Sequence, residues 1–183
     1  VELITRIAEN LRNLSKPVNA KFSRTDVNQI MNHAVEIMHS TAGRIKQFSR
    51  QPDARYKLNI QLADQPLPVR GDSDQLLQAF MNLIINAAHA LEEVGKGTLT
   101  LESRREADTV VVSIADDGPG IPEELRDKIF EPYFTTKGEE KGTGLGLTIV
   151  RDIIKAHHGE LTFETHTGVG TRFEIRLPLM LSA

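Results

Sequence analysis

The chain has 183 residues, enough for one hydrophobic core and a short appended element. Its 22 basic and 25 acidic side chains leave a formal charge of −3, so neither nucleic acid nor an anionic membrane is favoured as a partner. The lack of cysteine excludes disulfides and thiolate metal sites and suits a reducing, cytoplasmic compartment. No apolar run is long enough to cross a bilayer.

The N-terminal segment predicts the end of a helix. Its apolar residues recur at steps of three, four and three: Ile4, Ile7, Leu11 and Leu14. That seam suits a coiled coil or a helical bundle, but two heptads are too short to stand alone in water. We therefore expect residues 1–16 to be the truncated C-terminal end of a longer bundle helix, and residues 17–183 to form the main domain. Pro17 disfavours continued helix, because it pushes the preceding residue toward extended geometry.

The middle of the chain predicts a helix, a strand and a longer helix. A polar residue before Val27 can cap the first helix, whose apolar residues keep helical spacing up to Met38. Residues 55–62 alternate between apolar and polar side chains, as a strand does, and two prolines interrupt the segment after this strand. The longer helix is predicted from about residue 72 to Glu93, with a broad apolar stripe.

The C-terminal half alternates strand patterns with helical ones. We expect a strand pair at 98–104 and 109–115, a short helix at 122–129, a mobile loop at 131–144, a helix at 145–157, and a hairpin of 160–165 with 171–179. Together these elements predict an α/β fold in which helices cover one face of a mixed sheet.

Two asparagines on the long helix are candidate metal ligands. Asn82 and Asn86 are four residues apart, so they project from one side of the helix. Two polar residues on a helix more often form a solvated face, but asparagine is a poor residue for a helix interior. An amide oxygen is a hard, neutral ligand that suits Mg²⁺.

A polar turn follows the second strand of the predicted pair. Asp116 ends an apolar strand and precedes Asp117-Gly118-Pro119-Gly120, a composition that is also typical of an ordinary turn. At a strand end, the Asp116 carboxylate can accept a hydrogen from the exocyclic amino group of adenine. Gly118 and Gly120 lack side chains, so a base can approach the backbone. We expect Asp117 to turn toward solvent.

A second glycine-rich run opens the helix predicted at 145–157. In Gly142-Thr143-Gly144-Leu145-Gly146-Leu147 the backbone N–H groups can point at an anion, supported by the helix dipole. The run is neither the dinucleotide fingerprint, because no strand directly precedes it, nor a P-loop, because no Lys-Ser or Lys-Thr follows. The alternative is a flexible loop before an ordinary helix start.

The segment before this run has the composition of a lid. Phe130, Tyr133 and Phe134 can anchor it, and Thr135-Thr136-Lys137 follow. Lys137 can reach a phosphate, although a solvated lysine is the usual alternative. The histidines show no zinc-binding pattern, and no serine elbow or cysteine nucleophile is present.

Taken in order, these motifs resemble the catalytic, ATP-binding domain of bacterial sensor histidine kinases. The family's N box matches Asn82-Leu-Ile-Ile-Asn86-Ala, and its first glycine box matches Asp116-Asp-Gly-Pro-Gly-Ile121. The F box matches Ile129-Phe-Glu-Pro-Tyr-Phe-Thr-Thr-Lys137. The second glycine box matches Gly142 to Leu147, and the last glycine box matches Gly168-x-Gly-Thr171-x-Phe173. The resemblance covers roughly residues 20–181. The short lid is most similar to the lid of the nitrogen-regulator type of sensor kinase.

This resemblance implies a two-layer α/β sandwich, the Bergerat fold, with ATP bound between the helices and the lid. It implies that Asn86 coordinates Mg²⁺ and Asn82 supports it, that Asp116 recognises adenine with help from Thr171 through water, and that Asn82 and Lys137 serve catalysis. The implied nucleotide contacts are Asn86, Asp116, Gly118, Gly120, Ile121, Thr136, Lys137, Gly142, Thr143, Gly144, Leu145, Gly146, Leu147 and Thr171.

The chain departs from the family pattern at two places. The family's phosphorylated histidine precedes Glu or Asp, with a proline a few residues on, and neither His33-Ala34 nor His39-Ser40 matches. We therefore expect the acceptor histidine to lie outside this chain. A lysine or arginine often stands three residues after the metal-binding asparagine, where this chain has His89.

The expected function is that of a protein-histidine kinase domain, which transfers the γ-phosphoryl group of Mg-ATP to that external histidine. The expected partners are the phosphoacceptor helix of the same kinase and a response regulator receiver domain, within a parent that is a homodimer.

Three alternatives stay open. A related ATPase of the topoisomerase and chaperone class is disfavoured, because that class has a glutamate where this chain has Asn82, and an amide cannot act as a base. An anti-sigma-type protein serine kinase is disfavoured by the N-terminal helical seam. A non-enzymatic nucleotide binder is the third alternative.

Overall fold

The computed structural model describes residues 21–40, 48–51, 53–136 and 143–181. The elements in chain order are β1 (Ser23–Asp26), α2 (Val27–Ser40), β2 (Phe48–Ser49), β3 (Tyr56–Gln61), β4 (Pro68–Gly71), α3 (Ser73–Val94), β5 (Gly97–Glu106), β6 (Thr109–Asp116), the 3-10 turn η2 (Glu123–Leu125), α4 (Gly146–Ala156), β7 (Glu160–His166) and β8 (Gly170–Pro178). The bundle helix predicted at 1–16 lies outside the described residues.

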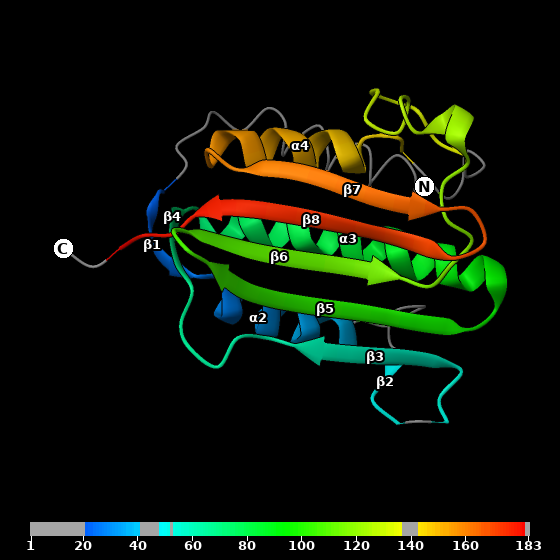
Figure 1. Ribbon diagram of the computed structural model, residues 1–183, viewed down its shortest axis with the longest axis horizontal. Coiled ribbons are helices and arrows are strands. Elements are labelled where there is room, and N and C mark those ends of the chain that lie inside the picture. The colour runs from blue at the N-terminus through cyan, green and yellow to red at the C-terminus, as the bar shows by residue number, and fades with distance from the viewer. Residues whose placement is uncertain (1–20, 41–47, 52, 137–142, 182–183) are drawn as a thin grey trace.

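A mixed sheet forms one layer of the molecule. Over the described part of the chain it has six strands, in the order β2-β3-β5-β6-β8-β7. β2 with β3 and β3 with β5 pair in parallel, whereas β5 with β6, β6 with β8 and β7 with β8 pair antiparallel. Helices α2 and α3 lie behind the sheet in Figure 1, and α4 runs along β7 and packs against α3. The predicted α/β sandwich is therefore confirmed.

The hydrophobic core fills the space between the two layers. Its largest fully buried side chains include Phe80, Leu83, Ile84 and Leu91 of α3, with Leu99, Leu101 and Ile114 of the sheet. These α3 residues belong to the apolar stripe predicted from the sequence, so α3 is the central helix of the layer. No helix in the described ranges is both long and apolar enough to cross a membrane.

Both ends of α3 are set by capping residues. The Asp72 carboxylate caps the helix by accepting hydrogen bonds from the backbone N–H groups of Asp74 and Gln75. Gly95 ends it in the left-handed conformation, at φ 80°. These caps fix where α3 begins and ends, and its buried apolar side chains fix which face of the helix meets the sheet.

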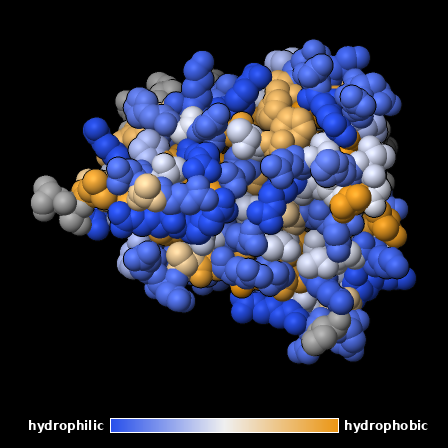
Figure 2. Space-filling model, viewed as in Figure 1, coloured by the Kyte–Doolittle hydropathy of each residue, from blue (hydrophilic) through white to orange (hydrophobic). Residues whose placement is uncertain are grey.

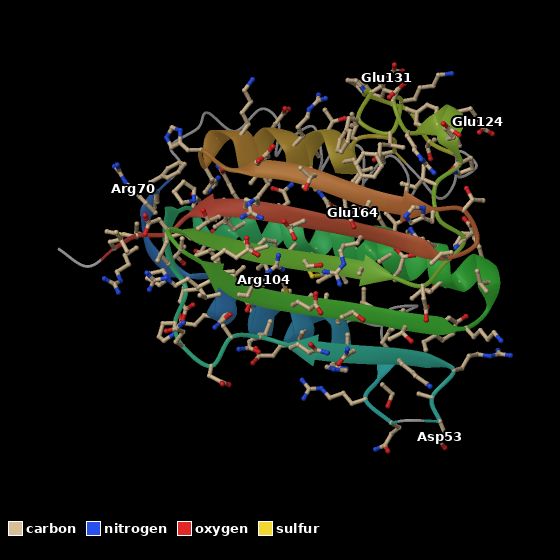
Figure 3. The ribbon with its side chains drawn as sticks, in the orientation of Figure 1. Asp53, Arg70, Arg104, Glu124, Glu131 and Glu164 are labelled. Carbon is tan, nitrogen blue, oxygen red and sulfur yellow. The ribbon has the colours of Figure 1, made fainter. Side chains whose placement is uncertain are left out.

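Among the described residues no helix covers the opposite face of the sheet, which is lined by charged side chains. Figure 2 shows it as largely hydrophilic, and Figure 3 shows Arg104 and Glu164 on it. Arg104 contacts Glu174 at 2.9 Å and Glu106 at 2.7 Å, and Arg176 contacts the same two carboxylates. Across β5 and β8 these ion pairs cover the backbone that the helices leave open.

Two local features differ from the sequence-based prediction. β1 and β4 form an antiparallel pair that was not predicted, because strands of four residues are too short to show a period. Asp26 does cap α2, and its Oδ1 accepts from both Asn28 N and Leu67 N at 3.0 Å. The short helix expected at 122–129 was wrong in extent. Only η2 is helical, and turns follow it, such as Lys128 N to Leu125 O at 2.9 Å.

Candidate nucleotide site

A cavity of about 410 Å³ opens between α3 and the segment that connects β6 to α4. Its walls come from α3, the end of β6, the segment after β6, the start of α4, and β8. The lining residues are Asn82, Ile85, Asn86, Ala87, His89, Ala90, Glu93, Asp116, Pro119, Gly120, Ile121, Pro122, Leu125, Ile129, Phe134, Thr135, Thr136, Thr143, Gly144, Gly146, Leu147, Thr171 and Phe173. Its volume suits a ligand the size of a nucleotide.

Most of the residues singled out in the sequence meet in this cavity. These are Asn82, Asn86, Asp116, Gly120, Ile121, Thr136, Thr143, Gly144, Gly146, Leu147 and Thr171. Gly118 and Leu145 do not line it, and both are buried. Lys137 and Gly142 lie outside the described residues. Segments far apart in the sequence are thus brought to one place.

The asparagines of α3 face the start of α4. Asn82 Nδ2 donates a hydrogen bond to the carbonyl oxygen of Gly146, at 3.4 Å. A Cβ added to Gly146 would lie 3.9 Å from Asn86 Nδ2. Both amides therefore stand at the N-terminal end of α4, where the helix dipole favours an anion.

A left-handed glycine holds the turn before α4. Gly144 has φ 66°, and a Cβ there would lie 2.3 Å from the carbonyl carbon of Tyr133. Tyr133 N donates to Gly144 O at 3.0 Å, so the end of the predicted lid packs directly on the second glycine run. Leu145 N donates to Thr143 Oγ1 at 3.4 Å, and the Leu145 side chain is buried in the core. Because of this burial, the side chain of Leu145 is not available to a ligand.

The turn after β6 folds over its own carboxylate. Gly118 N donates to Asp116 Oδ1 at 3.0 Å, and a Cβ at Gly118 would lie 2.7 Å from that oxygen. Gly118 was expected to let a base approach the backbone. Instead, its missing side chain makes room for Asp116. Asp117 turns outward as expected, and it accepts a hydrogen bond from Thr98 N at 2.5 Å.

The hairpin of β7 and β8 clamps the same turn. Gly168 N donates to Pro119 O at 2.7 Å. A Cβ at Gly120, which has φ 71°, would lie 2.3 Å from the carbonyl oxygen of His166. A Cβ at Gly170 would lie 2.0 Å from the carbonyl oxygen of Asp116. Gly120 of the first box and Gly170 of the last box therefore allow two backbones to touch, which fixes one wall of the cavity.

Sequence reasoning missed part of the apolar wall. Ile85, Ala90 and Leu125 line the cavity, but none of them is predicted from the sequence to belong to the site. Such residues could surround the flat faces of a base. Their sequence signal is weak, because an apolar residue beside a cavity has the same spacing as one within the core.

In the part of the chain that the structure describes, no three His, Cys, Asp or Glu side chains are grouped to hold a metal ion. The amide oxygens of Asn82 and Asn86 are hard and neutral, and they fit a magnesium ion that takes its other ligands from water and phosphate.

Comparison with known proteins agrees with this geometry. Residues 71–181 match the family described as histidine kinase-, DNA gyrase B-, and HSP90-like ATPase. Sensor histidine kinase ZraS of Escherichia coli K12 is 31% identical over 179 residues, which is 98% of this chain and 36% of that protein. Sporulation kinase C of Bacillus subtilis is 32% identical over 98% of this chain and 39% of its own length.

Solved structures give the same result. The catalytic domain of histidine kinase ThkA superposes with a TM-score of 0.70 at 31% identity, covering 87% of this chain and 96% of that one. A complex of ThkA with response regulator protein TrrA gives 0.71 at 27% identity, covering 97% of this chain and 47% of that one.

The chain therefore belongs to the family of histidine kinase-, DNA gyrase B- and HSP90-like ATPases. Within it, the chain is the catalytic, ATP-binding domain of a sensor histidine kinase. It spans a little over a third of the length of its ZraS relatives.

Proposed function

We propose that this domain holds Mg-ATP in the cavity and presents the γ-phosphoryl group to a histidine located outside this chain. The observation that carries the proposal is the meeting of three different chemistries in one cavity. Asn82 and Asn86 supply amides, the start of α4 supplies backbone N–H groups, and Asp116 supplies a carboxylate.

The adenine would lie against the end of β6. Asp116 would accept from its exocyclic amino group, with Thr171 assisting through water, and Gly120 and Ile121 would contact the ring. An acceptor at this place favours adenine over guanine, because guanine carries a carbonyl where adenine carries the amino group.

The triphosphate would lie between α3 and the start of α4. Backbone N–H groups of residues 142–147 would bind phosphate oxygens, and Thr136 and Lys137 would close over them from the lid. Asn86 would hold Mg²⁺, and Asn82 would orient it while keeping its bond to Gly146. The ion would supply charge neutralisation on the phosphates.

Catalysis would depend on positioning. A neutral imidazole nitrogen of the acceptor attacks the γ-phosphorus, the bond to the β-γ bridging oxygen breaks, and ADP leaves with the electron pair. The imidazole proton passes to an acidic side chain beside the acceptor. An amide at Asn82 leaves water without a base there, so hydrolysis is not favoured as the main reaction.

The remaining partners follow from the same proposal. The parent protein would be a homodimer through the helical bundle predicted from the spacing of residues 1–16, and it would be a sensor kinase of the nitrogen-regulator type. A response regulator receiver would accept the phosphoryl group from the histidine. ThkA, a structural relative, has been solved with such a regulator.

The test mixes this chain with a separate phosphoacceptor domain and ATP labelled at the γ-phosphate. Label that is lost in acid and retained in base, on the acceptor histidine, supports the proposal. Acid-stable label on serine supports the serine-kinase alternative, and rapid phosphate release without a protein acceptor supports the ATPase. Asn82→Glu is the matched variant. We expect it to raise phosphate release, because it supplies the carboxylate that the ATPase class uses to activate water. Absence of saturable ATP binding would favour the non-enzymatic alternative.

A further inference from the structure

A row of three polar side chains crosses the sheet at the cavity. Asp116 of β6 is paired with Thr171 of β8, and Thr171 is paired with Thr165 of β7. The side chains of directly paired residues project on the same face of a sheet, with their Cβ atoms about 4.5–5.5 Å apart. Asp116 and Thr171 line the cavity, whereas Thr165 stands behind Thr171 and does not.

The hydroxyl of Thr165 is saturated with hydrogen bonds. It accepts from the backbone N–H of Ile121 at 2.8 Å, and it donates to the carbonyl oxygen of Gly170 at 3.0 Å. Its third partner is the hydroxyl of Thr171, also at 3.0 Å. Thr165 and Thr171 are each only 7% exposed, so water does not replace these bonds.

The saturation fixes the direction of the last bond. A hydroxyl has one hydrogen and two lone pairs. A carbonyl cannot donate, so the single hydrogen of Thr165 is used on Gly170, and a backbone N–H takes one lone pair. The hydrogen between the two threonines must then come from Thr171. Thr171 is left with lone pairs toward the cavity.

We propose that Thr165 is a specificity-determining positioning residue, which makes Thr171 an acceptor toward the base and toward any water that bridges the two. Beside the Asp116 carboxylate, Thr171 then completes a wall that offers only acceptors. A ligand with an amino group at this place, such as adenine, donates to it. A purine with a carbonyl there, such as hypoxanthine, meets two acceptors. This inference rests on the proposed function, because it assumes that the cavity binds ATP.

A purely structural role for Thr165 is the competing explanation. The Ile121 bond holds the cavity wall, so its loss would weaken every nucleotide alike. The two roles differ in selectivity: if Thr165 directs the hydrogen of Thr171, then Thr165→Val frees that hydrogen to turn into the cavity and donate to a carbonyl.

The experiment measures the dissociation constants of ATP and inosine triphosphate by calorimetry, with Mg²⁺ present. We expect Thr165→Val to lower the preference for ATP by roughly tenfold, about the effect of one misdirected buried hydrogen bond. Thr165→Ser keeps the hydroxyl and should restore the preference to within about twofold. Thr162→Val is the control, because Thr162 is on the same strand but exposed on the opposite face.

Thr171→Val and the double variant complete the test. If Thr165 acts through Thr171, Thr165→Val should change the preference no further once Thr171 is valine. Equal loss of both affinities in Thr165→Val, or a Thr165→Ser variant as unselective as valine, overturns the inference. An unchanged preference for ATP over inosine triphosphate in Thr171→Val also overturns the inference. This second test can be made even if Thr165→Val fails to fold. No saturable ATP binding by the unmodified chain would instead refute the proposed function.

Discussion

At the scale of single residues, the cavity depends on places where a side chain is missing or has only one usable orientation. Gly170 lets the last glycine box touch the backbone of Asp116, and Gly144 lets the turn before α4 touch the backbone of Tyr133. His157 is buried at the end of α4, and its two ring nitrogens have opposite roles. Nδ1 must carry the hydrogen, because it bonds the carbonyl of Ile153 at 2.8 Å. Nε2 accepts from Asp72 N at 3.0 Å.

The two glycines of the hairpin turn should differ sharply in their tolerance of alanine. Gly168 has φ 79° with nothing within 4 Å of an added Cβ, whereas Gly170 has φ 139° and would place a Cβ 2.0 Å from Asp116 O. We expect Gly168→Ala to cost about 1 kcal/mol of backbone strain. Gly170→Ala should cost roughly 3 kcal/mol or more, because a steric clash is added. Urea denaturation measures both, and equal losses would contradict the contact seen here.

The neighbouring histidines offer a second comparison. His157→Phe keeps the ring but removes the acceptor for Asp72 N, so the free energy of unfolding should fall by about 1–3 kcal/mol. His158 is exposed and has φ 56°, where glycine is favoured. His158→Gly should therefore leave the stability unchanged or raise it. A His157→Phe variant as stable as the unmodified chain would show that the link to Asp72 contributes nothing.

At the scale of elements, the site is held between α3, α4 and the central strands. Asn82 joins α3 to the start of α4, and His157 joins the end of α4 to the cap of α3. The open face of the sheet is held by ion pairs across β5 and β8. Partial burial alone would raise the pKa of Glu174, but hydrogen bonds from Arg104 and Arg176, with their charge attraction, outweigh it and lower the pKa below its ordinary value. Hydrogen bonds from Arg176 and Arg104 also lower the pKa of Glu106.

These pairs predict a dependence of stability on pH. A carboxyl whose pKa is lower in the folded state stabilises the fold above its unfolded pKa, near 4.5, and this contribution is lost as pH falls through the folded pKa. We expect Glu174→Gln to destabilise the domain at pH 7 and to differ less from the unmodified chain below pH of about 4. Glu164→Gln is the control, because Glu164 takes part in none of these ion pairs (Figure 3). Thermal denaturation across pH measures this, and a constant difference would contradict it.

At the scale of the whole molecule, ligand binding should stabilise the fold. A ligand at a hundred times its dissociation constant adds about 2.7 kcal/mol to the free energy of unfolding. We expect ATP with Mg²⁺ to raise the melting temperature, and Asn86→Ala to abolish the part of the shift that depends on Mg²⁺. Asn32→Ala is the control, because Asn32 is an exposed helical asparagine of α2 that does not line the cavity. Equal shifts in both variants would argue against Asn86 as a metal ligand.

The sequence alone determined the elements whose pattern is local. The period of α3 and the alternation of β5, β6 and the hairpin are written in neighbouring residues, because burial on one face selects apolar side chains at a fixed spacing. The motifs were enough to indicate an ATP site, since each binds through groups that lie close together in the chain.

Only the tertiary structure decided what depends on contacts between distant segments. In the folded chain β1 pairs with β4, and the Asp116 carboxylate lies where a side chain at Gly118 would be. Thr165 lies behind Thr171 on the neighbouring strand. No local pattern marks these contacts, because each is made by residues that are ordinary within their own element. The sequence thus determined which chemistry the chain carries. Packing decided which side chains orient the hydrogen bonds of the site, because the direction of a hydrogen bond depends on neighbours that only folding brings together.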